Sequence, residues 1–369
     1  MKSVTRKYVE FGALCFLALA ILWWFGRKLD WHEVRHAVSH ANPYLLGLAT
    51  LAITLAYVFR AARWGALLAP LSRASLRNLY VATTVGFGAV FLLGRTGEVV
   101  RPVVLPMLDT KIRPSASFVT IMVERIYDMI AVVLLFAINL LWFQPPNASA
   151  EFGRVRTAGI VLLLVALAGV FGLTQFRKKS KGAISWIKTK LEGRRFIPTR
   201  LTRAILSILE QLASALRVLV DARELAVTVG WTAMVWVAIA AAQLLVFRAF
   251  GLPFGITQTV FVLGWSLVGS LVPTPGGAAG AFHAATAAGL ISLGVQRETA
   301  AAISIVLHIV DFGPALIFGV YYILRGDINL SRLRARTSSE SVEHQVEDEP
   351  ILSDELFAQT ELETAAARD

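Results

Sequence analysis

Cysteine, charge and catalytic motifs are all scarce in this sequence of 369 residues. It has one cysteine, Cys15, which excludes an internal disulfide and any CxxC-type metal or redox centre. Charged residues make up 17% of the chain, whereas an average soluble domain has about 25%. There is no Walker loop, and the Ser, His and Asp residues suggest no nucleophile arrangement. We therefore expect no ordinary cytoplasmic enzyme, no cofactor and no metal site.

Apolar residues are abundant and lie in long blocks. They make up 56% of the chain, which is too much for one soluble core. A transmembrane helix needs roughly 17–25 predominantly apolar residues. The pattern predicts an all-α, polytopic transmembrane helical bundle with about six full spans, at 11–25, 43–59, 115–143, 157–176, 225–247 and 299–324.

Two further apolar elements, 79–108 and 256–294, are interrupted in the middle. Each has an apolar half, a break rich in glycine or proline, and a second apolar half. Irregular backbone at membrane depth is tolerated only where protein buries it or water reaches it, and paired broken helices mark transporter substrate sites. We predict two re-entrant hairpins whose breaks allow movement, through Gly94, Gly97, Pro273, Pro275, Gly276 and Gly277.

The distribution of charge predicts the orientation and the domains. With both termini cytoplasmic, most Lys and Arg residues fall on the cytoplasmic side. Residues 1–325 then form the transmembrane domain, with 29–41 as an outer amphipathic helix. Within it, 177–224 is a basic amphipathic cytoplasmic segment on the membrane surface, or alternatively a small soluble helical hairpin. Residues 326–369 are predicted to be a disordered acidic tail.

The net charge of +11 suggests an anionic partner. A basic hydrophobic chain is attracted to the anionic cytoplasmic leaflet, here through 177–224. Nucleic acid is disfavoured, because no basic segment interleaves with aromatic residues in a soluble domain.

The first interrupted element contains a set of three charged residues. Arg95, Glu98 and Arg101 would lie near one face if 95–101 is helical. Two guanidiniums can clamp a phosphate, and Glu98 would orient them or meet a cationic head group. The alternative is a structural ion pair at the tip, or a cytoplasmic anchor.

A second set of charges lies inside the predicted span 115–143. Charges within a span normally face the bundle interior. Glu124, Arg125 and Asp128 would either complete the polar lining of a substrate site or only pair with Arg95 and Arg101.

Histidines form two further groups. His283, His308 and Asp311 could transfer protons, since histidine titrates near neutrality, although a buried, satisfied histidine is more common. On the outer helix a solvated face is favoured over a metal site for His32, His36 and His40.

Four ordered motifs give the chain a family resemblance over roughly residues 8–325. It resembles the lysylphosphatidylglycerol synthase transmembrane-region family of flippase-like proteins. The motifs are Arg60-x-x-Arg63-Trp64, Gly94-Arg95-x-Gly97-Glu98-x-x-Arg101, Glu124-Arg125-x-x-Asp128 and Pro273-Thr274-Pro275-Gly276-Gly277. The chain departs from the family pattern in two places: Gly94 replaces a proline, and the segment from the double glycine to His283 is one residue longer.

The resemblance implies an integral, multi-pass protein of the cell inner membrane related to the flippase half of the multiple peptide resistance factor. Relatives handle aminoacylated phospholipids, polyprenyl-linked sugars or hopanoids. The aminoacyl-transferase that makes lysylphosphatidylglycerol is a separate soluble domain, so we expect no synthase activity from this chain. We expect it to bind or translocate an amphipathic lipid between the two hairpins. The alternative is a non-catalytic subunit or scaffold for an envelope or glycolipid biosynthetic enzyme.

Overall fold

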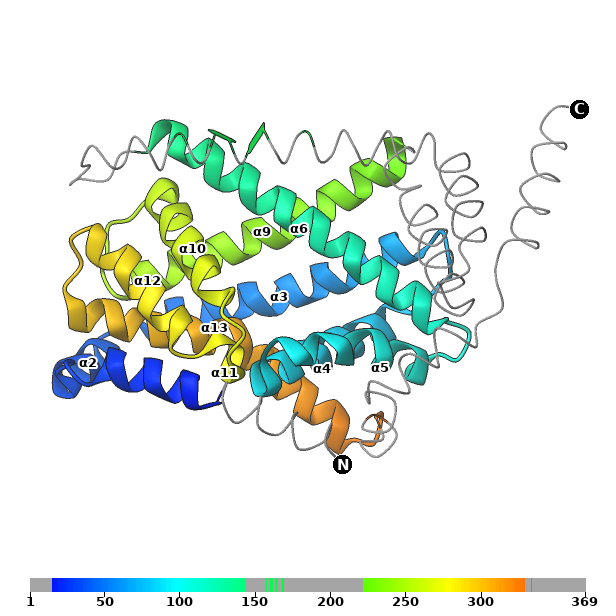
Figure 1. Cartoon of the computed structure of the whole chain (residues 1–369), viewed down its shortest axis with the longest axis horizontal. Coiled ribbons are helices and arrows are strands. Elements are labelled where there is room, and N and C mark those ends of the chain that lie inside the picture. Colours follow the sequence, from blue (N-terminus) through cyan, green and yellow to red (C-terminus); the bar gives the residue numbers. More distant parts are fainter. Residues whose placement is uncertain are drawn as a thin grey trace, which may run out of the picture.

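The computed structural model describes residues 15–143 and 222–328, a few single positions between 157 and 168, and residue 333. The predicted span 157–176, nearly all of 177–224 and most of the acidic tail therefore lie outside the described residues. All regular secondary structure in the described part is helical (Figure 1), which confirms the all-α class. The elements are helix Cys15–Gly26, α2 (Trp31–Ser39), α3 (Pro43–Leu68), α4 (Leu76–Leu93), η1 (Gly94–Val99), α5 (Val100–Leu108), α6 (Pro114–Trp142), α9 (Ala222–Ala249), α10 (Ile256–Ser270), α11 (Pro275–Ala278), α12 (Ala281–Ser292) and α13 (Arg297–Leu324).

Four of the described helices are long and apolar enough to cross a membrane. They are α3, α4, Leu225–Ala249 within α9, and α13. A membrane-embedded bundle is thus confirmed. The second half of the first interrupted element, α5, is too short to cross, as predicted, but α4 qualifies as a span by its length and composition.

The end of the second span was predicted wrongly. We expected it to stop at 59, before two arginines, but α3 continues to Leu68. Asn42 begins this helix by accepting hydrogen bonds from the backbone amides of Tyr44 and Leu45 at 3.0 and 3.3 Å. The extra turns are helical because their residues, Trp64 among them, are buried in the bundle. Arg60 and Arg63 therefore lie within the helix.

The first interrupted element is a hairpin in which α5 packs back along α4. Two glycines allow the close approach. A Cβ on Gly86 would lie 2.6 Å from the Cβ of Arg101, and a Cβ on Gly97 would fall inside the backbone of Ala89. The chain therefore reverses between α4 and α5, as the sequence predicted.

The second interrupted element is a hairpin of α10 and α12. The hydroxyls of Ser266 and Thr286 hydrogen-bond across it at 2.9 Å. Between the two helices, Gly276, Gly277 and Ala278 have φ of 77°, 62° and 65°. This is a left-handed turn, and glycine is the residue that adopts it at least cost. The double glycine is thus required by the reversal of the chain.

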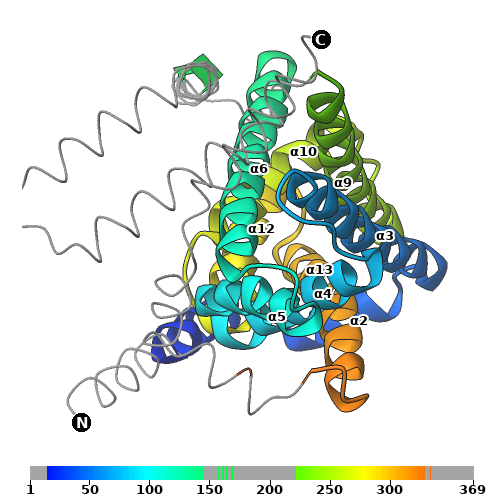
Figure 2. The same ribbon diagram turned by 90° about the vertical axis from the view of Figure 1, so that its right-hand side faces the viewer.

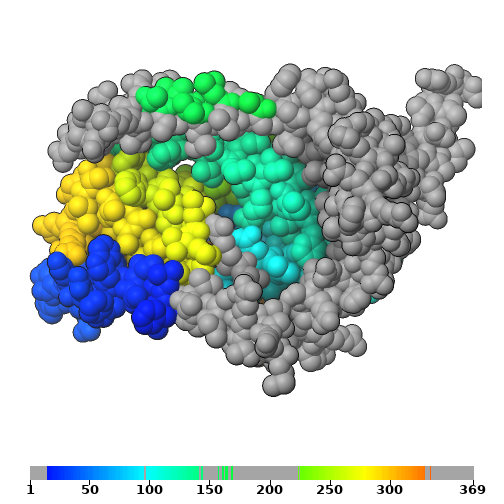
Figure 3. All heavy atoms as spheres, in the orientation of Figure 1, coloured from blue at the N-terminus to red at the C-terminus, as the bar shows by residue number. Residues whose placement is uncertain are grey.

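The tips of the two hairpins touch. A Cβ on Gly94 would lie 2.9 Å from the carbonyl oxygen of Thr274, so the backbone of one break rests on the backbone of the other. Figures 1 and 2 show α3 and α9 side by side and α13 packed against α4. In Figure 3, the α10–α12 hairpin (yellow) and α6 (teal) border a hollow in this face of the molecule.

Candidate functional site

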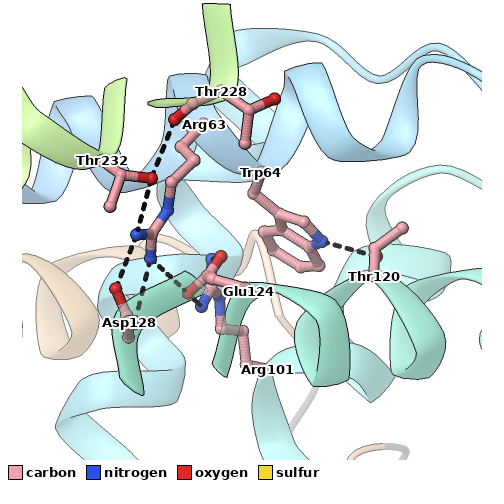
Figure 4. A network of polar contacts seen from close by, with 8 residues as sticks. All are labelled: Arg63, Trp64, Arg101, Thr120, Glu124, Asp128, Thr228 and Thr232. Carbon is pink, nitrogen blue, oxygen red and sulfur yellow. Dashed lines mark hydrogen bonds and ion pairs between the residues drawn. The ribbon is translucent and has the colours of Figure 1, made fainter. Parts of the chain in front are cut away.

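A buried network of charged residues joins α3, α5 and α6. Arg63, which is fully buried, donates from Nη1 and Nη2 to the two carboxylate oxygens of Asp128 at 2.6 and 3.1 Å. Its Nη2 also lies 3.2 Å from Oε1 of Glu124, and its Nη1 lies 3.5 Å from Oγ1 of Thr232 on α9. Figure 4 shows Arg63 between these acceptors. One guanidinium therefore ties three helices together.

Arg101 completes the network from α5. It donates to both carboxylate oxygens of Glu124 at 2.6 and 2.9 Å, and its guanidinium lies 4.3 Å from the centroid of the Trp64 ring. The indole Nε1 of Trp64 donates to Oγ1 of Thr120 at 3.0 Å (Figure 4). Arg101 and Glu124 are almost completely buried. A bidentate pair of this kind is the strong form of a charged hydrogen bond.

Three guanidiniums surround one aromatic ring, that of Phe87 on α4. They belong to Arg60 at 4.9 Å, Arg101 at 5.9 Å and Arg125 at 6.0 Å from the ring centroid. Within the described part of the chain, the half-buried Arg60 and Arg125 have no hydrogen bond or ion pair with a carboxylate. Arg63 and Arg101, in contrast, each donate two hydrogen bonds to a carboxylate.

The polar layer has more positive than negative charge. Four arginines, at 60, 63, 101 and 125, face two buried carboxylates, those of Glu124 and Asp128. Asp311 on α13 lies within electrostatic range of Arg60. Counting Asp311 as ionised, the layer still has an excess of one positive charge. Unpaired charge at membrane depth is expensive, so the layer favours an anion.

A pair of histidines lies at the second break. The rings of His283 and His308 are 4.7 Å apart between centroids. Nδ1 of His283 accepts from the backbone N–H of Gly280 at 3.2 Å, and Nε2 of His308 donates to the carbonyl of Gly277 at 3.1 Å. Because a carbonyl only accepts, this bond places the proton of His308 on Nε2. His308 thus holds the left-handed turn, and His283 caps the start of α12 directly after it.

Two phenylalanines on α4 connect the arginine layer to the histidine pair. Phe87 lies among the guanidiniums, and Phe91, one turn later, is 5.6 Å from the ring of His308. The hydroxyl of Tyr57 on α3 donates to the backbone carbonyl of Asp311 at 2.8 Å. The polar groups of both hairpins therefore belong to one continuous interior.

Several of the predicted site residues come together. Arg101, Glu124, Arg125 and Asp128 are neighbours, whereas His283 lies at the second break beside His308 and not in the arginine layer. Glu98 is exposed on η1, and the side chain of Arg95 is outside the described part. Gly94 and Pro275 lie where the tips meet, and Pro273 is exposed just before that contact.

Sequence reasoning missed Arg60 and Arg63 as site residues. Both are in the first family motif, but an arginine at the end of an apolar run was interpreted as a membrane boundary. The spacing Arg60-x-x-Arg63 puts both on one helix face, and this was the available signal.

One catalytic motif also escaped sequence-based prediction. Residues 32–36, His-Glu-Val-Arg-His, match the HExxH pattern of zinc hydrolases, which uses two histidines one turn apart. In α2 the side chains of His32, Glu33 and His36 are exposed. No group of three or more His, Cys, Asp or Glu residues in the described ranges could hold a metal ion. Among these residues the motif therefore has no third protein ligand of the kind that a catalytic zinc site uses.

An apolar groove of about 600 Å³ adjoins the charged network. It lies between α6, α9 and α10, and its lining includes Tyr127, Thr232 and Trp236 at one end and Ile138 and Leu244 at the other. Thr232 is the residue whose hydroxyl faces Arg63. The groove thus runs from the charged layer along the helices.

Comparison with known proteins identifies the family. The family model described as lysylphosphatidylglycerol synthase TM region matches residues 12–319. The chain belongs to this family. It is similar to the UPF0104 membrane protein PH1989 of Pyrococcus horikoshii, with 22% identity over 332 residues, which cover 85% of this chain and 96% of that protein. The matched stretch of this chain includes the arginine layer and both hairpins.

Proposed function

We propose that this protein binds a membrane lipid with an anionic head group and moves it across the cell inner membrane without catalysing a reaction. The observation that supports the proposal best is the pair of guanidiniums, those of Arg60 and Arg125, that make no hydrogen bond or ion pair with a carboxylate among the described residues. They lie in an interior layer with excess positive charge, where a phosphate would restore the balance.

The arginines divide into two roles in this proposal. Arg63 and Arg101 are held by carboxylates and position α3, α5 and α6. Arg60 and Arg125, which lie 4.9 and 6.0 Å from the centroid of the Phe87 ring, hold the anionic part of the lipid. Arg95 and Glu98, at the tip of the first hairpin, remain candidates for contact with the remainder of the head group.

The second break provides the element that moves. Its turn has left-handed backbone, accepts a hydrogen bond from His308 at the carbonyl of Gly277, and touches the first break directly. Just after the turn, His283 accepts a hydrogen bond from the backbone N–H of Gly280. Of the lipid classes that the family resemblance suggests, aminoacylated phospholipids and polyprenyl-linked sugars with a phosphate contain the phosphate group that the arginines of this layer can bind.

The test replaces both free arginines. The double variant Arg60→Gln, Arg125→Gln keeps polar side chains but removes the two charges, and Arg77→Gln serves as the control because the Arg77 side chain is 60% exposed. In native mass spectrometry we expect phosphatidylglycerol to bind the double variant at least tenfold more weakly than wild type, and the control to bind normally. In proteoliposomes, translocation of a fluorescent phosphatidylglycerol should fall in parallel. Unchanged binding and translocation in the double variant would remove these arginines from the function.

The scaffold alternative depends on 177–224 and the acidic tail, which are outside the described residues. It stays a prediction, as does attachment of 177–224 to the anionic leaflet. Deleting 337–369 would distinguish the two functions. Loss of a co-purifying enzyme with intact lipid translocation favours a docking role for the tail.

A further inference from the structure

We infer that the apolar groove between α6, α9 and α10 holds one fatty acyl chain of the transported lipid, with its ester end at the charged layer. This inference rests on the proposed function and specifies the lipid as an acylated glycerolipid. It assigns a binding role to residues outside the charged layer.

The position of the groove supports this assignment. Two of its lining residues, Tyr127 and Thr232, adjoin the charged network: Asp128 follows Tyr127, and Thr232 lies 3.5 Å from Arg63. A head group held in the charged layer would therefore place one of its chains at the mouth of the groove, beside Thr232.

The length of the groove matches one leaflet. From Tyr127 to Ile138 the helix rises roughly 17 Å, and from Thr232 to Leu244 roughly 18 Å, at about 1.5 Å per residue. The hydrocarbon of one leaflet is about 15 Å thick. A chain that starts at the charged layer can thus lie along the whole groove.

The volume of the groove selects one linear chain. About 600 Å³ accommodates roughly 20 carbon groups if each takes about the 30 Å³ of a water molecule in the liquid. One fatty acyl chain fits this space, whereas two chains or a long polyprenyl chain do not. The second acyl chain would remain in the bilayer.

Two buried hydrogen-bond donors line the end of the groove that adjoins the charged layer. The hydroxyl of Tyr127 and Nε1 of Trp236 have no hydrogen-bond partner among the described residues, and each side chain is more than nine-tenths buried. A buried donor without an acceptor costs about 1–3 kcal/mol. An ester carbonyl at the start of an acyl chain is an acceptor of the right kind at this level, and an isoprenoid chain has none.

The test narrows the far part of the groove. Ala240 lines it about 12 Å along α9 from Thr232, so Ala240→Trp should block a long chain and spare the head-group end. Ala241→Trp repeats the change at a neighbouring wall position. Met234→Trp, on an exposed position outside the groove lining, is the matched control.

Binding of phosphatidylglycerol with two 18-carbon chains or two 6-carbon chains is measured by native mass spectrometry on the full chain. We expect both groove variants to bind the long-chain lipid about tenfold more weakly and the short-chain lipid like wild type, with the control unchanged. Normal long-chain binding in both variants, or equal loss of both lipids, would overturn the groove assignment. Stronger binding of a polyprenyl phosphate that Ala240→Trp weakens would overturn the acyl chain as occupant.

Failure of the proposed function would give a different binding result from failure of the groove assignment alone. In that case wild type binds neither phosphatidylglycerol, or the double variant Arg60→Gln, Arg125→Gln binds both normally. A defective groove with an intact head-group site instead appears only as altered dependence on chain length.

Discussion

Removing the carboxylate of Glu124 should destabilise the fold more than removing any other single charge in the described network. Glu124 accepts from Arg101 at 2.6 and 2.9 Å and lies 3.2 Å from Arg63, with no exposed surface. In Glu124→Ala, Arg101 keeps no carboxylate partner among the described residues. Breaking a buried ion pair from one side costs about 3–5 kcal/mol.

Asp128→Ala should cost less, about 1–3 kcal/mol, because Arg63 retains Glu124 as a partner. Both substitutions remove a carboxylate side chain, but only Glu124→Ala leaves an arginine without its carboxylate partner among the described residues. The difference between their unfolding free energies therefore reports the loss of that partner and not the loss of side-chain volume. Glu98→Ala is the control on an exposed position, and its effect should stay within about 0.5 kcal/mol.

The assay is unfolding of the purified protein by titration with sodium dodecyl sulfate from dodecyl maltoside micelles, followed by tryptophan fluorescence. The double variant Arg101→Met, Glu124→Leu replaces the pair with apolar side chains and should recover at least about 2 kcal/mol of the loss, since an apolar replacement of a buried pair is often neutral. The reasoning is wrong if Glu124→Ala is within about 1 kcal/mol of wild type, or if the double variant is no more stable than Glu124→Ala.

Three further predictions use the same protein preparation. Gly97→Ala should unfold at lower detergent concentration than wild type, because its new Cβ has no space beside α4. Gly47→Ala is the control, since nothing lies within 4 Å of its new Cβ, and it should unfold like wild type. If both variants unfold at the same detergent concentration, the close packing of α5 on α4 is wrong. Trp64→Phe removes the donor to Thr120 and should lower the unfolding free energy by about 1–3 kcal/mol, a stable variant arguing against that bond. Elemental analysis should find no stoichiometric zinc despite the HExxH pattern at 32–36, and bound zinc removed by mutating either histidine would refute this.

The two hairpins could be predicted from the sequence because their breaks are local. Glycine and proline interrupt the apolar runs directly, and the left-handed turn at Gly276 and Gly277 uses residues that suit it. The contact between Gly94 and Thr274 could not be predicted, since it joins positions far apart in the chain and depends on the packing of the whole bundle.

The extent of α3 shows why hydropathy fails at such a site. Hydropathy places the end of a membrane span at an arginine unless the arginine is known to have a partner inside the bundle. The partners of Arg63 are Asp128 on α6 and Thr232 on α9, which are far from it in the sequence. Sequence spacing grouped Glu124 with Asp128 correctly on one helix face. It could not decide which arginine meets which carboxylate, because that choice is made between helices.

The contact of Gly94 with Thr274 restricts how the interior can rearrange. Main chain rests on main chain there, with no side chain between them to change rotamer and absorb a small displacement. A shift of either tip by the size of a methyl group must therefore be followed by the other or must separate the two. The contact thus couples the two hairpins: they move as one piece while it lasts, and they move independently once it has opened.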